Sequence, residues 1–128
     1  MFNCIDLENS GLILSVSGDC VEVRILKSIF NYQCYEISLK QDLLLEDNET
    51  RTINTGIKMK VPEGCVAIVH SAYPENGCEV EYERFFPSDG EIDLKIDIGN
   101  FYPDNGIIYK NSGFAHLYLK EDAPTRPV

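Results

Sequence analysis

The segment Thr50–Val61 constrains the fold of this chain more than any other part of the sequence. Apolar side chains recur along it at alternate positions: Ile53, Ile57, Met59 and Val61. Successive side chains of a β-strand point to opposite faces of the sheet, so this pattern predicts a long strand with one buried face. The turn Pro62-Glu63-Gly64 follows and ends the predicted strand.

Shorter stretches of the same kind fill the rest of the chain, and turn residues separate them. No segment predicts a helix. The other expected strands are Gly11–Ser17, Cys20–Leu26, Tyr35–Leu39, Leu43–Leu45, Cys65–Ser71, Cys78–Tyr82, Ile92–Ile98, Ile107–Tyr109 and Phe114–Leu119. Many short strands favour a sandwich or barrel, so we predict one antiparallel all-β domain over residues 1–120, followed by a tail over 121–128.

Two segments lead to more specific expectations. Gly18-Asp19 separates two predicted strands, which predicts that these strands pair as a hairpin. After Gly77, apolar residues alternate with glutamates, which predicts a strand with two different faces: Cys78, Val80 and Tyr82 on the apolar face, and Glu79, Glu81 and Glu83 on the acidic one.

The charge balance limits the classes of partner. The net charge is −10 and the sequence pI is about 4.5. Such a surface repels phosphate backbones and anionic lipid, so we expect neither nucleic acid nor membrane as a partner. No apolar run approaches the ~20 residues of a membrane helix, and the first residues lack the basic region of a secretory signal.

Cysteine and histidine usage gives further limits. The five cysteines are odd in number and none has C-x-x-C spacing, so we predict buried free thiols in a reducing compartment such as the cytoplasm. His70 and His116 are the two histidines, too few for a multi-histidine metal centre. We therefore assign no metal, no cofactor and no cofactor-binding residue.

Acidic residues gather around one predicted turn, and they allow two interpretations. The group consists of Asp42, Glu46, Asp47 and Glu49. Clusters of this kind are commonly solvated surface, but they also suit docking of a basic partner. The residues that we select as candidates for docking are Asp47, Glu49, Glu79, Glu81 and Glu83.

Several motifs, in the correct order, resemble those of the trimeric dUTPases and the related dCTP deaminases. Thr55-Gly56-Ile57 with Pro62-Glu63-Gly64 resembles the family's strand–turn signature. Tyr35-Glu36-Ile37, Gly90-Glu91-Ile92 and Lys110–Leu117 fall where that family has Gly-Tyr-Asp-Leu, Gly-Glu-Ile and Lys-Gly-Asp-Arg-Ile-Ala-Gln-Leu. The resemblance, which runs from Tyr35 to Leu119, implies an antiparallel, jelly-roll-like β-sandwich or barrel of the dUTPase type that forms a homotrimer.

The catalytic motifs of that family are largely missing. The family's phosphate-binding Pro-Arg-Ser-Ser-type turn is replaced by His70-Ser71-Ala72-Tyr73-Pro74, which contains no arginine. The resemblance places the family's water-orienting aspartate at Phe85 and its sugar-stacking tyrosine at Ser88. A phenylalanine cannot accept a proton from water, so we predict that the general base is lost and assign no catalytic residue. The family's glutamine and arginine of the last motif fall at His116 and Gly113.

Three groups are possible substitutes. Asp89 lies close in sequence to the missing aspartate, but Pro87–Gly90 is typical of a turn. His70 and His116 could act as acid and base if the fold brought them together, or they are ordinary half-buried histidines. Glu36, at the site of a family aspartate, is expected to keep a structural hydrogen bond.

The function that we expect is a non-catalytic one. The chain is predicted to be a trimeric structural or protein-binding module, an accessory protein of a virus or phage that binds itself and a virion or host protein. Its location is then the cytoplasm or the virion. Phe101, Tyr102 and Ile108 are expected to be exposed apolar residues that a trimer covers, and the tail after Lys120 to clasp a neighbour. The alternatives are a divergent dUTPase or nucleotide pyrophosphatase, and a nucleotide sensor.

Overall fold

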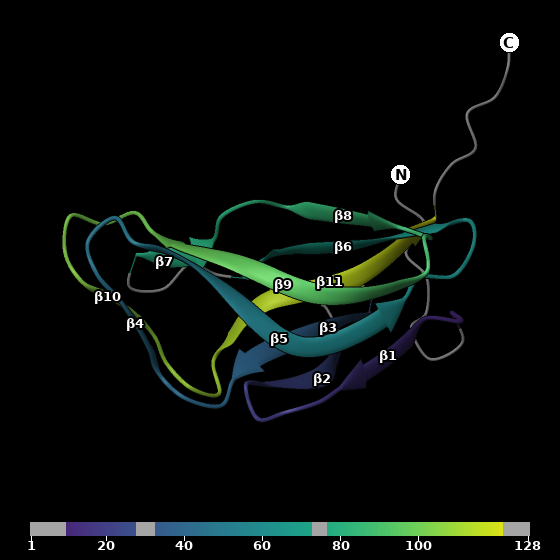
Figure 1. Cartoon of the computed structure of the whole chain (residues 1–128), viewed down its shortest axis with the longest axis horizontal. Coiled ribbons are helices and arrows are strands. Elements are labelled where there is room, and N and C mark those ends of the chain that lie inside the picture. The colour runs from purple at the N-terminus through teal and green to yellow at the C-terminus, as the bar shows by residue number, and fades with distance from the viewer. Residues whose placement is uncertain (1–9, 28–32, 73–76, 122–128) are drawn as a thin grey trace, which may run out of the picture.

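A computed structural model describes residues 10–27, 33–72 and 77–121, and this part of the chain contains strands and turns but no helix (Figure 1). The strands are β1 (Ile13–Val16), β2 (Val21–Lys27), β3 (Gln33–Leu39), β4 (Leu43–Leu45), β5 (Thr50–Lys60), β6 (Cys65–Ser71), β7 (Cys78–Val80), β8 (Arg84–Pro87), β9 (Glu91–Asn100), β10 (Gly106–Ile108) and β11 (Gly113–Glu121). Our expectations for Tyr73, Pro74, the turn residues 75 and 76, and the tail after residue 121 lie outside the described residues.

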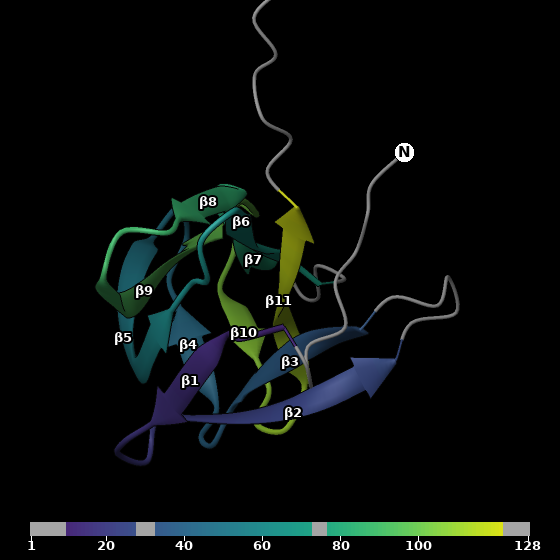
Figure 2. The same ribbon diagram turned by 90° about the vertical axis from the view of Figure 1, so that its right-hand side faces the viewer.

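The strands form two large sheets and one small ribbon. The first sheet has the order β1-β5-β9-β7, the second has the order β2-β3-β11-β6-β8, and β10 pairs with β4. Every pair is antiparallel. In Figure 1 the four-stranded sheet lies in front of the five-stranded one, and Figure 2 shows the strands curving around a common interior. The predicted all-β, antiparallel fold is confirmed.

The core lies between the two sheets. In β5, Ile53, Ile57 and Met59 are buried, as the alternating pattern predicts. Leu94, Ile96 and Ile98 of the neighbouring β9 are buried beside them. The buried Thr55 shares this face, and its hydroxyl donates a hydrogen bond of 2.7 Å to the Leu94 carbonyl. The polar group is therefore satisfied inside the core.

Gly56 explains the Thr-Gly-Ile part of the β5 motif. Its φ is +75°, and the pairing of β5 with β9 changes register between Asn54 and Lys58. A β-carbon at position 56 would overlap the Ser17 carbonyl oxygen, because the Ser17 amide donates to the Gly56 carbonyl at 2.9 Å. Only glycine combines this backbone conformation with so close an approach.

The predicted hairpin around Gly18-Asp19 is wrong. The turn is present, but β1 pairs with β5 in one sheet and β2 pairs with β3 in the other. The chain therefore crosses between the sheets at this turn. The local turn signal identifies where the chain reverses, whereas the partner of each strand is decided by the core.

The predicted two-faced strand after Gly77 is right for Cys78 and Val80, which are buried, and wrong from Glu81 onward. Strand β7 ends at Val80, and the Tyr82 side chain is 66% exposed. The expectation for Ile108 is wrong too, because Ile108 is only 5% exposed and belongs to the core. Phe101 and Tyr102 are exposed, as predicted.

The four described cysteines are free thiols: Cys34 and Cys78 are buried, as predicted, Cys65 is half-buried, and Cys20 is exposed, against the prediction. Burial raises the pKa of Cys34, Cys65 and Cys78, which keeps these thiols protonated. The described residues contain no helix whose length and apolar character would suit a membrane span.

Candidate functional site

A row of four polar side chains crosses the outward face of the five-stranded sheet. It consists of Arg24 on β2, Glu36 on β3, His116 on β11 and His70 on β6. The strand register pairs Arg24 with Glu36, Glu36 with His116, and His116 with His70. The next residues along two of these strands, Ile37 and Leu117, belong to the core, so the row points away from it. Figure 2 shows the strands that carry this polar row.

Glu36 is the most buried member of the polar row, at 9% exposed. Arg24 donates from Nε to Glu36 Oε1 at 2.6 Å, and its second nitrogen lies 2.5 Å from the same oxygen. An unpaired carboxylate at this depth would be costly, and the contact with Arg24 gives Glu36 its partner there. The structure thus agrees with a structural role for Glu36, and it identifies Arg24, which sequence patterns alone did not.

Gly113 provides the space that Glu36 occupies. A β-carbon at position 113 would collide with the Cγ, Cδ and Oε2 atoms of Glu36. The register between β11 and β3 also shifts next to Gly113. An arginine at position 113, where the resemblance places the family's arginine, is therefore incompatible with this position of Glu36. The arginine that pairs with Glu36 is Arg24, on the strand at the other side of β3.

The two histidines meet at the other end of the polar row. The ring centroids of His70 and His116 are 5.5 Å apart and their planes are nearly perpendicular, at 86°. Tyr118 packs edge-to-face against His70 at 5.3 Å. His70 Nδ1 donates a hydrogen bond of 2.8 Å to the Ser71 carbonyl, so the neutral tautomer of this ring carries its lone pair on Nε2. The condition under which these histidines could act together is thus met.

The surroundings of His116 favour its neutral form. Burial lowers the pKa of this imidazole below its usual value, and the nearby His70 lowers it further. The Glu36 carboxylate acts in the opposite direction but does not reverse the shift. His116 is therefore an uncharged ring near neutral pH.

The positions that the resemblance assigns to catalysis hold no acid. Phe85 lies on β8 opposite Ile68, and its side chain is 59% exposed. Ser88 and Asp89 are exposed in the turn between β8 and β9, and Gly90 there has a φ of +73°. Ala72 follows β6 and donates its backbone amide to the Phe114 carbonyl. The interpretation of Asp89 as a turn residue agrees with this geometry.

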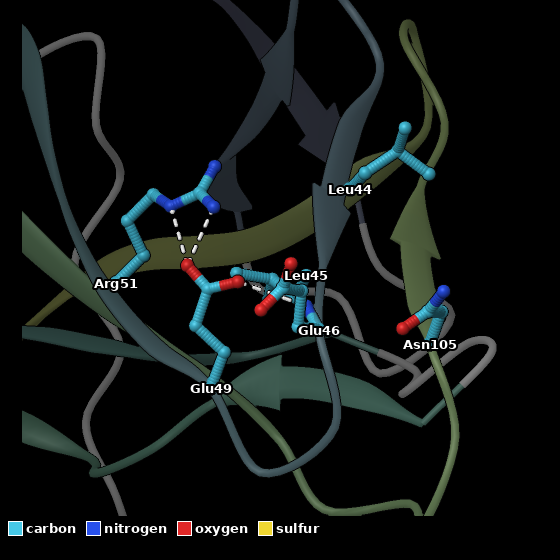
Figure 3. A pocket seen from close by; sticks show the side chains of 6 residues that line it. All are labelled: Leu44, Leu45, Glu46, Glu49, Arg51 and Asn105. Carbon is cyan, nitrogen blue, oxygen red and sulfur yellow. Dashed lines mark hydrogen bonds and ion pairs between the residues drawn. The ribbon is translucent and has the colours of Figure 1, made fainter.

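A pocket of about 490 Å³ opens beside the predicted acidic turn (Figure 3). Six residues line it: Leu44, Leu45, Glu46, Glu49, Arg51 and Asn105. Arg51 donates two hydrogen bonds to Glu49 Oε2. The backbone amide of Glu46 donates to Glu49 Oε1 at 2.8 Å. The pKa of Glu49 is lowered, first by the Glu46 amide and then by Arg51. This acid is therefore already paired within the chain.

The structure separates the five docking candidates. Glu49 directly precedes Thr50, and the Thr50 hydroxyl donates a hydrogen bond of 2.9 Å to Glu81. Glu79 lies on β7 and pairs with Gly99 of β9. Asp47 is exposed in the turn before Glu49, and Glu83 is exposed directly before β8. Four of the candidates thus lie near the start of β5 or on β7, while Glu83 lies apart. Their docking role stays a prediction.

Comparison with known proteins identifies the fold. No family model matches the sequence, and no curated protein does. Three similar solved structures are the Staphylococcus bacteriophage 80alpha dUTPase, a mutant dUTPase of phage phi11 of S. aureus, and the native EIAV dUTPase. In that order, their sequences are 16%, 16% and 14% identical to this chain, and the TM-scores are 0.72, 0.69 and 0.69. Each match covers 91% of this chain, and it covers 93%, 94% and 94% of the three dUTPase chains.

At these identities the likeness establishes the architecture. The chain has the dUTPase-like fold, as its sequence motifs imply, and it covers nearly the whole length of these phage and viral enzymes.

Proposed function

We propose that this chain is a non-catalytic protein with the dUTPase-like fold, which assembles with copies of itself and binds another protein. The observation that carries this proposal is Phe85. An exposed phenyl ring stands on β8 where the resemblance places the water-orienting aspartate. No proton acceptor of any kind is available on that side chain.

The outward faces of the two sheets support a role in assembly. On the four-stranded sheet the outward residues are charged and exposed: Lys58, Lys60, Glu91, Asp93 and Lys95. On the five-stranded sheet, Cys34, Ser38 and Ile68 are buried although none belongs to the core cluster between the sheets. Phe85 lies at the edge of this less charged face. Away from the Arg24–Glu36 ion pair this face carries few charges, and a weakly charged region with an exposed aromatic is typical of contact surfaces.

The phage and viral dUTPases of similar structure favour a viral or phage accessory protein as the source of this function. The resemblance favours three copies in the assembly. Repetition of one surface in three copies strengthens a weak contact through avidity, without any catalytic residue. The partner is then a virion or host protein.

The alternative is a divergent nucleotide pyrophosphatase or a nucleotide sensor. The contact between His70 and His116 is the observation that favours it, because paired histidines are suited to acid–base work. A thermal-shift experiment with deoxynucleotides and magnesium separates these functions. We expect no stabilisation by any nucleotide, since a ligand that binds the folded state raises the melting temperature.

The docking prediction has its own test. Asp47→Lys should weaken the retention of a virion or host partner in a pull-down assay, and added salt should do the same. Asp89→Lys is the matched control, because it makes the same change at an exposed acid on another turn. Equal retention of both variants and the parent would remove Asp47 from the interface.

A further inference from the structure

His70 and His116 lie directly opposite each other on neighbouring antiparallel strands. Their ring centroids are 5.5 Å apart. A tetrahedral metal ion with metal–nitrogen bonds of about 2.0–2.1 Å holds two imidazole rings at roughly this separation. The rings are nearly perpendicular, at 86°, and so do not stack face to face.

The hydrogen bond of His70 prepares it as a ligand. Its Nδ1 donates to the Ser71 carbonyl at 2.8 Å, so the proton is fixed on that nitrogen. The lone pair of Nε2 is left available. Metal-binding histidines in proteins are commonly oriented in this way, with the second ring nitrogen donating to a carbonyl or carboxylate.

The charged residues beside the pair suit a cation. The Glu36 carboxyl group lies next to His116 across the β3–β11 pairing, and Arg24 reaches it from β2 on the far side of β3. A divalent ion at the histidines would therefore lie nearer to an acidic residue than to Arg24.

We propose that His70 and His116 form a two-histidine site for a divalent transition-metal ion of the zinc or nickel type. Among the described residues, no group of three or more His, Cys, Asp or Glu is arranged to hold a metal, so water completes the coordination. Imidazole ligands select such ions over magnesium and calcium. The site goes beyond the proposed function, because it requires neither the assembly nor the absence of catalysis.

The experiment uses nitrogen NMR of the histidine rings in the full chain. The sequence contains two histidines, so the spectrum has two imidazole spin systems and assignment is direct. Zn²⁺ should shift a ring nitrogen of both histidines together and saturate at one ion per chain. Mg²⁺ at the same concentration should shift neither. Shifts of one ring alone, or of none, would overturn the proposal.

Two variants and one control test the ligands. His116→Gln and His70→Gln should each weaken Zn²⁺ binding by at least about tenfold, as measured by calorimetry. Cys20→Ser is the control, because Cys20 is an exposed thiol and thiols are zinc ligands; it should leave the affinity unchanged. Amide spectra confirm that each variant is folded. Unchanged affinity in either histidine variant would also overturn the proposal.

Discussion

The side chain of Glu36 lies against the backbone of Gly113, in space that the β-carbon of any other residue would fill. Glu36 belongs to β3 and Gly113 begins β11, so the contact joins two neighbouring strands of the five-stranded sheet. From this position the carboxylate reaches Arg24 on β2. The glycine thus allows a buried acid to cross the sheet and pair with a surface arginine.

We expect Gly113→Ala to destabilise the fold by about 1–3 kcal/mol, the usual cost of overpacking. The added methyl group displaces Glu36 and breaks its ion pair with Arg24. Urea unfolding measures the change. In a Glu36→Ala background the same substitution should cost much less, and an equal cost in both backgrounds would show that the contact is not the cause.

His116 should make the free energy of unfolding depend on pH below the unfolded pKa of its imidazole, about 6.5. Its pKa is lower in the folded state than its unfolded value of about 6.5, so the unfolded chain binds the proton more readily. The stability is therefore complete above about pH 6.5 and is lost as the pH falls toward the folded pKa. Arg24, Glu36 and His70 are the charged or titratable residues of the same row.

The measurement compares unfolding free energies at pH 7.5 and 5.5 in the parent and in His116→Gln. The loss on acidification should be smaller in the variant, because glutamine does not titrate. The same loss in both proteins would assign the pH dependence to other groups.

Gly56 and Gly18 form a matched pair for testing the approach of β1 to β5. Their φ values are similar, at +75° and +81°, but a β-carbon meets the Ser17 carbonyl at position 56 and nothing within 4 Å at position 18. Gly18→Ala should cost about 1–2 kcal/mol from the left-handed backbone alone. Gly56→Ala should cost clearly more in the same urea assay. Equal costs would show that the backbone contact contributes nothing.

Asn100 should be essential for the loops at its end of the molecule. Its amide nitrogen donates to the Glu46 carbonyl at 3.0 Å and to the Asp104 carbonyl at 2.7 Å, and its oxygen accepts from the Tyr102 amide. Asn100→Ala leaves these backbone groups without their partner, so we expect a loss of at least about 2 kcal/mol.

The control for Asn100 is Asn105→Ala, an exposed site for which we expect a change within about 0.5 kcal/mol. Melting temperatures of the two variants compare them directly. Similar losses would mean that the hydrogen bonds of Asn100 are not decisive.

Much of the fold follows from the alternation of apolar residues. Strands β4 and β6 have the predicted bounds, and the buried face of β5 is the predicted one. Strand pairing was harder to predict, since the turn at Gly18-Asp19 has the composition of a hairpin. Pairing depends on how both sheets cover one core, and a local turn carries no information on that.

The polar row shows the same limit for the site. His70, His116 and Glu36 were identified from the sequence, because each falls on a motif of the resembling family. Arg24 was not, because its meeting with Glu36 depends on the register of β2 against β3. The wrong face assigned to Tyr82 has a different cause: β7 stops at Val80, and alternation beyond the end of a strand has no meaning.

The release of pyrophosphate from dUTP by the purified chain, with magnesium, tests most directly whether catalysis is lost. Phe85 cannot orient water, and the missing arginine at Ala72 removes a second source of transition-state stabilisation. Each is typically worth several kcal/mol, so we predict no turnover above the uncatalysed background. Phe85→Asp alone should not restore it. Turnover of the parent chain at ~1 per second, a rate typical of enzymes, would contradict the proposed function.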